Sequence, residues 1–152
     1  MCPDIPPLPG SYVLILHLPQ DRVIPVGRLG HIPFPAGYYL YMGSARGPGG
    51  LRARIARHLR RQKRLHWHVD YLLHWTRPVE IWYSHSVAPL ECHWREVLME
   101  AAGLETAATG FGSSDCPCHT HLLYSQQRPA AAVAEALAQA TGLSVHRRTP
   151  PA

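Results

Sequence analysis

The sequence contains no asparagine, and Lys63 is the only lysine among its 15 lysine and arginine residues. No apolar run approaches the roughly 20 residues that a membrane-spanning helix needs. The N-terminus has neither the basic start nor the apolar segment of a signal peptide, and the four cysteines are too few for the disulfide framework of a small secreted protein. These absences predict a cytoplasmic protein that does not span a membrane.

The composition is that of a folded protein with a basic surface. Of the 152 residues, 46% are hydrophobic and 16% are charged, which fits one globular domain with a sizeable core. The net charge is +5 before any of the 11 histidines is protonated, and the isoelectric point is about 9.3. This excess of positive charge favours polyanionic partners, with nucleic acid as the first candidate.

The rest of the chain is organised around residues 37–61. The tyrosine-rich residues 38–42 favour a β-strand, and the glycines and proline of 47–50 favour a turn after it. Beyond the turn, apolar side chains recur at every fourth residue, the spacing of one helix face, at Leu51, Ile55 and Leu59. Arginines occupy much of the remaining surface of this helix. A tyrosine strand that leads through glycines into an arginine helix suits phosphate chemistry.

Apolar patterning also predicts the other elements. Further strands are expected at residues 10–18 and 79–84, and helices at residues 66–74, 89–102 and 130–140. We therefore predict an α+β fold with a small central antiparallel sheet of about three strands flanked by helices. A short extra hairpin or arm is expected within residues 19–37. Residues 10–128 would form the main domain, and residues 129–152 an alanine-rich helix and C-terminal tail.

Several side chains suit the hydrolysis of a phosphodiester bond. This reaction needs a group that accepts a proton from water, a cation at the phosphate, and stabilisation of the transition-state charge. Tyr12 and Tyr41 lie near ends of predicted strands, and Glu91 lies in the first turn of a later helix. Arg54 and His58 are one helical turn apart and therefore share a face.

Four short motifs contain these residues: Gly10-Ser11-Tyr12, Tyr41-Met42-Gly43, Leu51-Arg-Ala-Arg54-Ile-Ala-Arg-His58 and Leu90-Glu91. In type and order they resemble the motifs of the GIY-YIG nuclease superfamily. The chain resembles in particular a bacterial and archaeal branch that sometimes occurs attached to an endonuclease III-type glycosylase. The resemblance extends over residues 10–125.

This resemblance implies a metal-dependent endonuclease that hydrolyses a phosphodiester bond, in DNA rather than RNA, during repair or DNA processing. Tyr12 and Tyr41 would flank the attacking water, and one of them would act as the general base or relay the proton to it. Arg54 would hold the scissile phosphate, and His58 would accept a proton or donate to the phosphate. Glu91 would hold one divalent cation, Mg²⁺ or Mn²⁺.

One alternative is a catalytically weak or inactive nucleic-acid-binding module on the same fold. The superfamily's late asparagine has no counterpart in this chain, and Ser44 stands where many members have a lysine. Arg57 and Arg61, on the arginine helix, are expected to contact nucleic acid in either case. Other side chains that could take the place of the asparagine are Ser113, Ser114, Asp115 or a late histidine.

A second alternative is a zinc-stabilised interaction domain. Cys116, Cys118 and His121 offer thiolate and imidazole groups, which are the ligands of structural zinc. Their Cys-x-Cys spacing is not that of the usual zinc knuckle, and a fourth ligand, Cys92 or His93, would have to come from a distant segment. This loop is therefore the weaker alternative.

Overall fold

The structure, a computed structural model, describes residues 4–100, 104–108, 110–111 and 120–151. Its centre is a six-stranded antiparallel sheet with the strand order β6-β7-β4-β1-β5-β8. The three long strands in the middle are β1 (Gly10–Leu18), β4 (Gly37–Ala45) and β5 (Arg77–His85). The edges are formed by the much shorter strands β6 (Glu105–Thr106), β7 (Leu122–Ser125) and β8 (His146–Arg148).

The prediction of a sheet of about three strands is wrong, because the described residues form six strands in the main sheet and two in a second sheet. The edge strands β6 and β8 have two and three residues, too few to show an alternating pattern, whereas β7 coincides with a short strand-like run at residues 121–124. They are held by backbone hydrogen bonds to longer neighbours, β6 and β7 on the β4 side and β8 on β5. Backbone pairing of this kind cannot be recognised from the pattern of apolar and polar residues.

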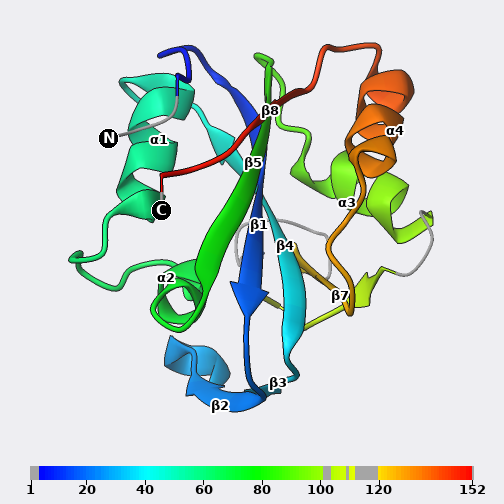
Figure 1. Ribbon diagram of the computed structural model, residues 1–152. Helices are drawn as coiled ribbons and strands as arrows, with labels where there is room; N and C mark the ends of the chain where they lie inside the picture. Colours follow the sequence, from blue (N-terminus) through cyan, green and yellow to red (C-terminus); the bar gives the residue numbers. More distant parts are fainter. Residues whose placement is uncertain (1–3, 101–103, 109, 112–119, 152) are drawn as a thin grey trace.

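Helices cover both faces of the sheet (Figure 1). Helices α1 (Gly50–Leu59) and α2 (His68–Leu73) lie on one face, and α3 (Glu91–Glu100) and α4 (Ala131–Thr141) lie on the other. Because successive side chains of a strand point to opposite faces, β1 contributes to two separate cores. Its residues Tyr12, Leu14 and Leu16 pack with the first pair of helices, and Val13 and Ile15 pack with the second.

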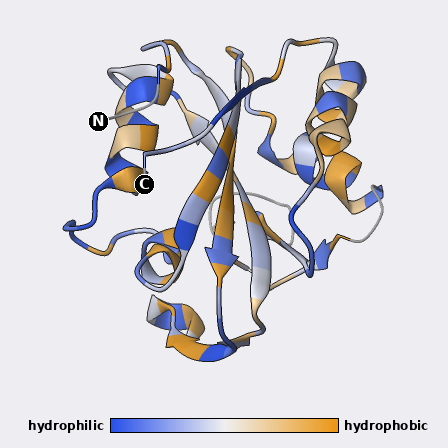
Figure 2. Ribbon diagram, viewed as in Figure 1, coloured by the Kyte–Doolittle hydropathy of each residue, from blue (hydrophilic) through white to orange (hydrophobic). Residues whose placement is uncertain are grey.

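Helix α1 forms where the sequence pattern predicts it. Leu51 and Ile55 are buried, whereas the arginines of the helix lie at exposed or partly exposed positions (Figure 2). The helix begins after Gly49 and at Gly50, whose φ angles are 82° and 55°. A Cβ at Gly50 would overlap the backbone of Leu8, so this turn requires glycine both for its dihedral angles and for the close approach of the N-terminal segment.

Residues 22–34 form a second, two-stranded sheet. Strands β2 (Arg22–Pro25) and β3 (His31–Phe34) pair around the 3₁₀-helix η1 (Gly27–Leu29). Ile24 and Phe34 are buried in the core beneath α2, and Figure 1 shows this small sheet below β1 and α2. Pro25 and Pro33 have no backbone N–H to donate. Proline is tolerated here because both strands of this small sheet are edge strands.

The C-terminal residues pack against the rest of the chain. Ala134 and Leu137 of α4 are buried against α3 and the sheet, and β8 pairs with β5. The carboxylate of Glu80, almost fully buried, forms salt bridges with Arg128 at 3.1 Å and with Arg147 at 2.6 Å. No helix in the described part of the chain has the length and apolar composition needed to cross a membrane.

Candidate active site

Four of the predicted site residues line one cleft of about 240 Å³. Tyr12 comes from β1, Tyr41 from β4, Arg54 from α1 and Glu91 from α3. His58 does not line the cleft but is hydrogen-bonded to Tyr12, which does, and it lines a second, larger hollow. The other lining residues are Gly43, Ser44, His66, Trp67, His68 and His121.

The register of β1 and β4 places the two tyrosines together. Tyr12 lies opposite Gly43, and Tyr41 lies opposite Leu14, so the tyrosines are diagonal neighbours on one face of the sheet. A Cβ at Gly43 would overlap the ring of Tyr12. The glycine of this motif is therefore required because the Tyr12 ring lies directly over its backbone, in the space that a side chain would occupy.

Tyr12 and His58 form a buried hydrogen-bonded pair. The Tyr12 hydroxyl lies 2.7 Å from Nε2 of His58, and the side chains are 1% and 2% exposed. Burial, helped by the positive charge of Lys63, lowers the pKa of His58 to about 3. Burial also raises the pKa of Tyr12 far above its usual range. Both groups are therefore neutral near pH 7, and we infer that the Tyr12 O–H donates to the lone pair of Nε2.

This tautomer leaves the proton of His58 on Nδ1, which has no hydrogen-bond partner among the described residues. The imidazole is surrounded by aromatic rings, with centroid distances of 5.5 Å to Trp67 and 6.1 Å to Tyr41. Burial raises the pKa of Tyr41 as well, against the opposing effect of the Arg54 charge. The two phenols of the cleft, those of Tyr12 and Tyr41, are therefore neutral near pH 7.

Arg54 is held in place by contacts that leave its charge unneutralised. Its Nη1 donates to the carbonyl oxygen of Ser44 at 3.0 Å, and its guanidinium lies 4.5 Å from the ring centroid of Trp67. Within the described ranges, Arg54 takes part in no salt bridge. A positioned guanidinium without a carboxylate partner, at the edge of a cleft, is suited to bind a phosphate.

Glu91 supplies the carboxylate of the cleft. The residue before it, Leu90, donates its backbone N–H to the buried Oγ of Ser11 at 3.2 Å, which ties the start of α3 to the residue next to Tyr12. Oε1 of Glu91 is buried and has no hydrogen-bond partner within the described residues. A buried, unpartnered carboxylate oxygen is costly unless a donor or cation satisfies it.

These features fit one divalent cation. Of the described residues, no group of three or more His, Cys, Asp or Glu side chains is arranged as a metal site, so the protein would contribute Glu91 alone. Mg²⁺ is commonly held by one or two carboxylates, waters and substrate phosphates rather than by a cage of protein ligands. The donor set at Glu91 is therefore suitable for Mg²⁺ and poor for zinc.

The two predicted nucleic-acid contacts lie outside the cleft. Arg57 forms a bidentate salt bridge with Asp70, with N–O distances of 3.0 and 3.1 Å, and stacks over Trp67 at 4.2 Å. Asp70 also accepts the backbone N–H groups of His66 and Trp67. Arg61 lines a second, larger hollow.

Trp67, which contacts both Arg54 and Arg57, is not among the predicted site residues, and neither are His66 and His68, which line the cleft beside it. The available signal was the aromatic and imidazole cluster His66-Trp67-His68 directly after the arginine helix. Of the candidates for the place of the late asparagine, His121 lines the cleft, whereas Ser113, Ser114 and Asp115 lie outside the described residues.

The proposed zinc ligands are only partly described. Cys116 and Cys118 lie outside the described residues. Nε2 of His121 is 3.9 Å from Sγ of Cys92. Cys92, the suggested fourth ligand, is disulfide-bonded, and zinc is bound by the thiolate rather than by a disulfide sulfur.

A model of the family described as "Domain of unknown function DUF123" matches residues 11–142 of the chain. The match includes every residue of the cleft as well as α4. It does not by itself establish membership of the GIY-YIG superfamily. No curated protein and no solved structure gives a match to this chain.

Proposed function

The chain belongs to the DUF123 family, and from the geometry of its cleft we propose that it is a metal-dependent endonuclease that hydrolyses a phosphodiester bond of DNA. One observation carries this proposal: two buried tyrosines, an arginine without a carboxylate partner and an unpartnered carboxylate converge on one cleft from four different elements. This is the set that phosphodiester hydrolysis requires. The resemblance to GIY-YIG nucleases, noted from the motifs, supports the same reaction.

Glu91 is the proposed ligand of the divalent cation through its buried Oε1. When bound, Mg²⁺ would act as a Lewis acid on the phosphate and stabilise negative charge at the leaving oxygen. The residues fix where this happens, because α3 is anchored at Leu90 to the β1 residue that precedes Tyr12.

Tyr12 and His58 are the proposed route for the proton of the attacking water. As water attacks, its proton passes to the oxygen of Tyr12 while the phenolic proton of Tyr12 moves to Nε2 of His58, which is 2.7 Å away. The imidazolium formed in this way is disfavoured in the free protein, because burial lowers the pKa of His58. An anionic phosphate in the cleft would raise that pKa and make the transfer easier.

Arg54 and Tyr41 are the proposed contacts to the phosphate. The guanidinium of Arg54, fixed by the Ser44 carbonyl and by Trp67, would stabilise the charge that develops on the non-bridging oxygens. Tyr41 stays protonated because burial raises its pKa, so it can donate a hydrogen bond to the phosphate but cannot act as a phenolate base.

The alternative function is a nucleic-acid-binding module with little or no catalysis. The observation that favours it is the serine at position 44, which offers its backbone carbonyl to Arg54 and brings no positive charge to the cleft. Such a module would bind DNA in a salt-sensitive manner and would show no turnover that depends on a divalent cation.

A plasmid-nicking assay separates these two functions. We expect the wild-type protein to nick supercoiled DNA with Mg²⁺ or Mn²⁺, and Glu91→Gln and Arg54→Ala to lower the rate by about 100-fold or more, the scale of losing one transition-state contact. Glu96→Gln is the matched control, because Glu96 lies on the same helix but is exposed and outside the cleft. Equal nicking by wild type and Glu91→Gln would disprove the proposed metal ligand, and no nicking with DNA binding retained would favour the binding module.

A further inference from the structure

A second hollow, of about 770 Å³, lies next to the segment that connects α1 to α2. We call it the basic groove. Its cationic lining is formed by Arg60, Arg61, Lys63 and Arg77, together with His74. Asp70 is the only carboxylate among its lining residues, and that carboxylate is already paired with Arg57. Within the described residues, the arginines of the groove take part in no salt bridge.

The positive charge of the groove is concentrated enough to affect the titration of Lys63. Burial lowers the pKa of Lys63 to about 8, and the neighbouring Arg57, Arg60 and Arg61 add to this effect against the opposing charge of Asp70. The Lys63 ammonium donates to the backbone carbonyl oxygens of Arg57 and His58. Because Arg60, Arg61 and Arg77 have no carboxylate partner among the described residues, the groove is suited to bind an anion.

The groove also offers apolar and aromatic surface, which a site for free phosphate would not need. Leu59, Leu73 and Pro78 contribute to its lining, with Leu65, which is 47% exposed. Beside it lies Trp75, which is 40% exposed. The guanidinium of Arg22 lies over one face of the Trp75 ring, 4.0 Å from its centroid. The ring of His74, a residue of the groove lining, stands nearly perpendicular to the Trp75 ring, with the two centroids 4.9 Å apart.

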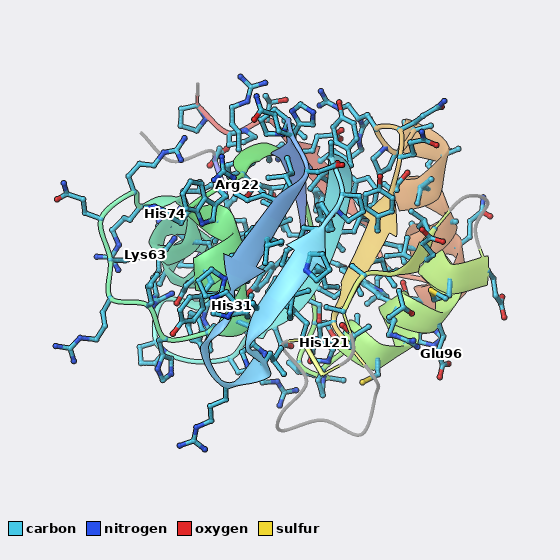
Figure 3. The ribbon with its side chains drawn as sticks, turned by 90° about the horizontal axis from the view of Figure 1, so that it is seen from below. Arg22, His31, Lys63, His74, Glu96 and His121 are labelled. Carbon is cyan, nitrogen blue, oxygen red and sulfur yellow. The ribbon has the colours of Figure 1, made fainter. Side chains whose placement is uncertain are left out.

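The cationic side chains of this region lie together on one side of the molecule. Figure 3 shows Lys63, His74 and Arg22 on the same side, and Glu96 of α3 on the opposite side. The basic groove and the cleft meet along the α1–α2 connection, because the consecutive residues Leu65 and His66 line the groove and the cleft respectively. A chain held in the groove is thereby placed next to the cleft.

We propose that the basic groove and Trp75 bind a single strand of nucleic acid, with phosphates on Arg61 and Arg77 and an unstacked base on the face of Trp75 that Arg22 does not cover. Unpaired bases are bound by aromatic faces beside a cationic track for the backbone. A duplex has its bases stacked inside and would leave the apolar lining and Trp75 unused. This inference goes beyond the proposed function, because it predicts binding that requires neither the cleft nor cleavage.

Binding is measured by fluorescence anisotropy with EDTA present, so that hydrolysis is excluded. The probes are a fluorescein-labelled oligothymidylate of about 15 nucleotides, near the upper range of known single-strand site sizes, and a duplex of the same length. The variants are Arg61→Ala, Arg77→Ala, Trp75→Ala and Trp75→Leu. Trp75→Leu keeps apolar volume while removing the stacking face. Arg28→Ala is the charge-matched control, because Arg28 is exposed on η1 and outside both hollows.

We expect the wild type to prefer the single strand, and both Trp75 variants to weaken single-strand binding by about tenfold while leaving duplex binding unchanged. Arg61→Ala and Arg77→Ala should each reduce the slope of log K against log salt by about 0.7. Arg28→Ala should have neither effect, and thermal melts would identify any variant that is misfolded. Equal affinity for both probes, or single-strand binding that neither Trp75 variant weakens, would overturn the proposal. A wild-type protein that binds the oligothymidylate but never nicks DNA would leave this inference intact and refute only the proposed function.

Discussion

At the scale of single residues, His58 shows how burial sets the chemistry of the site. A histidine in water is protonated below about pH 6.5, but in this fold burial lowers the pKa of His58 to about 3. The neutral ring can therefore accept the hydrogen bond of Tyr12 throughout the range in which nucleases work. The same shift links protonation to folding, because the unfolded chain binds a proton that the folded chain rejects.

This linkage predicts acid sensitivity that depends on His58. The stability that comes from keeping His58 neutral is fully present above about pH 6.5 and is lost as the pH falls towards about 3, by about 1.4 kcal/mol per pH unit. Between pH 7 and pH 5 the wild type should lose about 2 kcal/mol more than His58→Gln, as measured by urea unfolding. His31→Gln, at an exposed position of β3, should behave as the wild type. Identical losses in wild type and His58→Gln would contradict the assignment.

At the scale of elements, Asp70 determines how α2 and the preceding segment are arranged. Its carboxylate accepts two backbone N–H groups, from His66 and Trp67, and two N–H groups from Arg57. Burial by itself would raise the pKa of Asp70, but these hydrogen bonds outweigh it and lower the pKa. Because Trp67 stacks with Arg54, one carboxylate on α2 helps to position the arginine on α1 that we propose binds the phosphate.

We predict that Asp70→Asn costs about 2–3 kcal/mol of unfolding free energy, somewhat less than the loss of a fully buried ion pair because Arg57 is 21% exposed. It should also slow nicking, since Trp67 is no longer fixed against Arg54. The measurement is urea unfolding of Asp70→Asn, Arg57→Ala and the double variant. A double-mutant cycle should give a coupling energy of at least about 1 kcal/mol, and additive effects would show that the two side chains act independently.

At the scale of the whole molecule, Glu80 joins the C-terminal residues to the sheet. It lies on the central strand β5, and it accepts hydrogen bonds from Trp82, Arg128 and Arg147. Burial by itself would raise the pKa of Glu80, but these donors lower it. The segment after residue 128 is therefore fixed by charge as well as by the apolar residues of α4.

We predict that Arg147→Ala destabilises the protein by about 1–2 kcal/mol at pH 7, because a buried carboxylate loses one of its charged donors. The pKa of Glu80 is lowered in the folded state, so its contribution is present above the usual glutamate range and is lost as the pH falls through the lowered value. Thermal melts of Arg147→Ala and wild type should therefore converge as the pH falls below the usual glutamate range. Arg148→Ala is the control, because Arg148 donates to backbone carbonyl oxygens. A difference for Arg147→Ala that does not depend on pH would rule out the charge-based explanation.

The sequence predicted the long central strands and α1 because the spacing of apolar residues within each of these elements indicates which faces are buried. In β1 apolar residues fill both faces, and in α1 they recur every fourth residue. Side-chain patterns did not indicate β6 or β8, nor that the strand-like residues of β7 join the main sheet, because pairing at a sheet edge is made by backbone groups. Side-chain patterns could therefore not predict the number of strands in the sheet.

The sequence by itself determined the kinds of chemistry available: phenols, an arginine, a histidine and a carboxylate, each on an element that local patterning could place. Tertiary structure alone decided which of them meet, because Tyr12 and His58 are 46 residues apart and Ser11 and Leu90 are 79 apart. Those meetings depend on sheet register and helix docking, which no spacing within one element encodes. The fold also brought Trp67 and His121 into the cleft and placed Arg60, Arg61 and Arg77 along the basic groove.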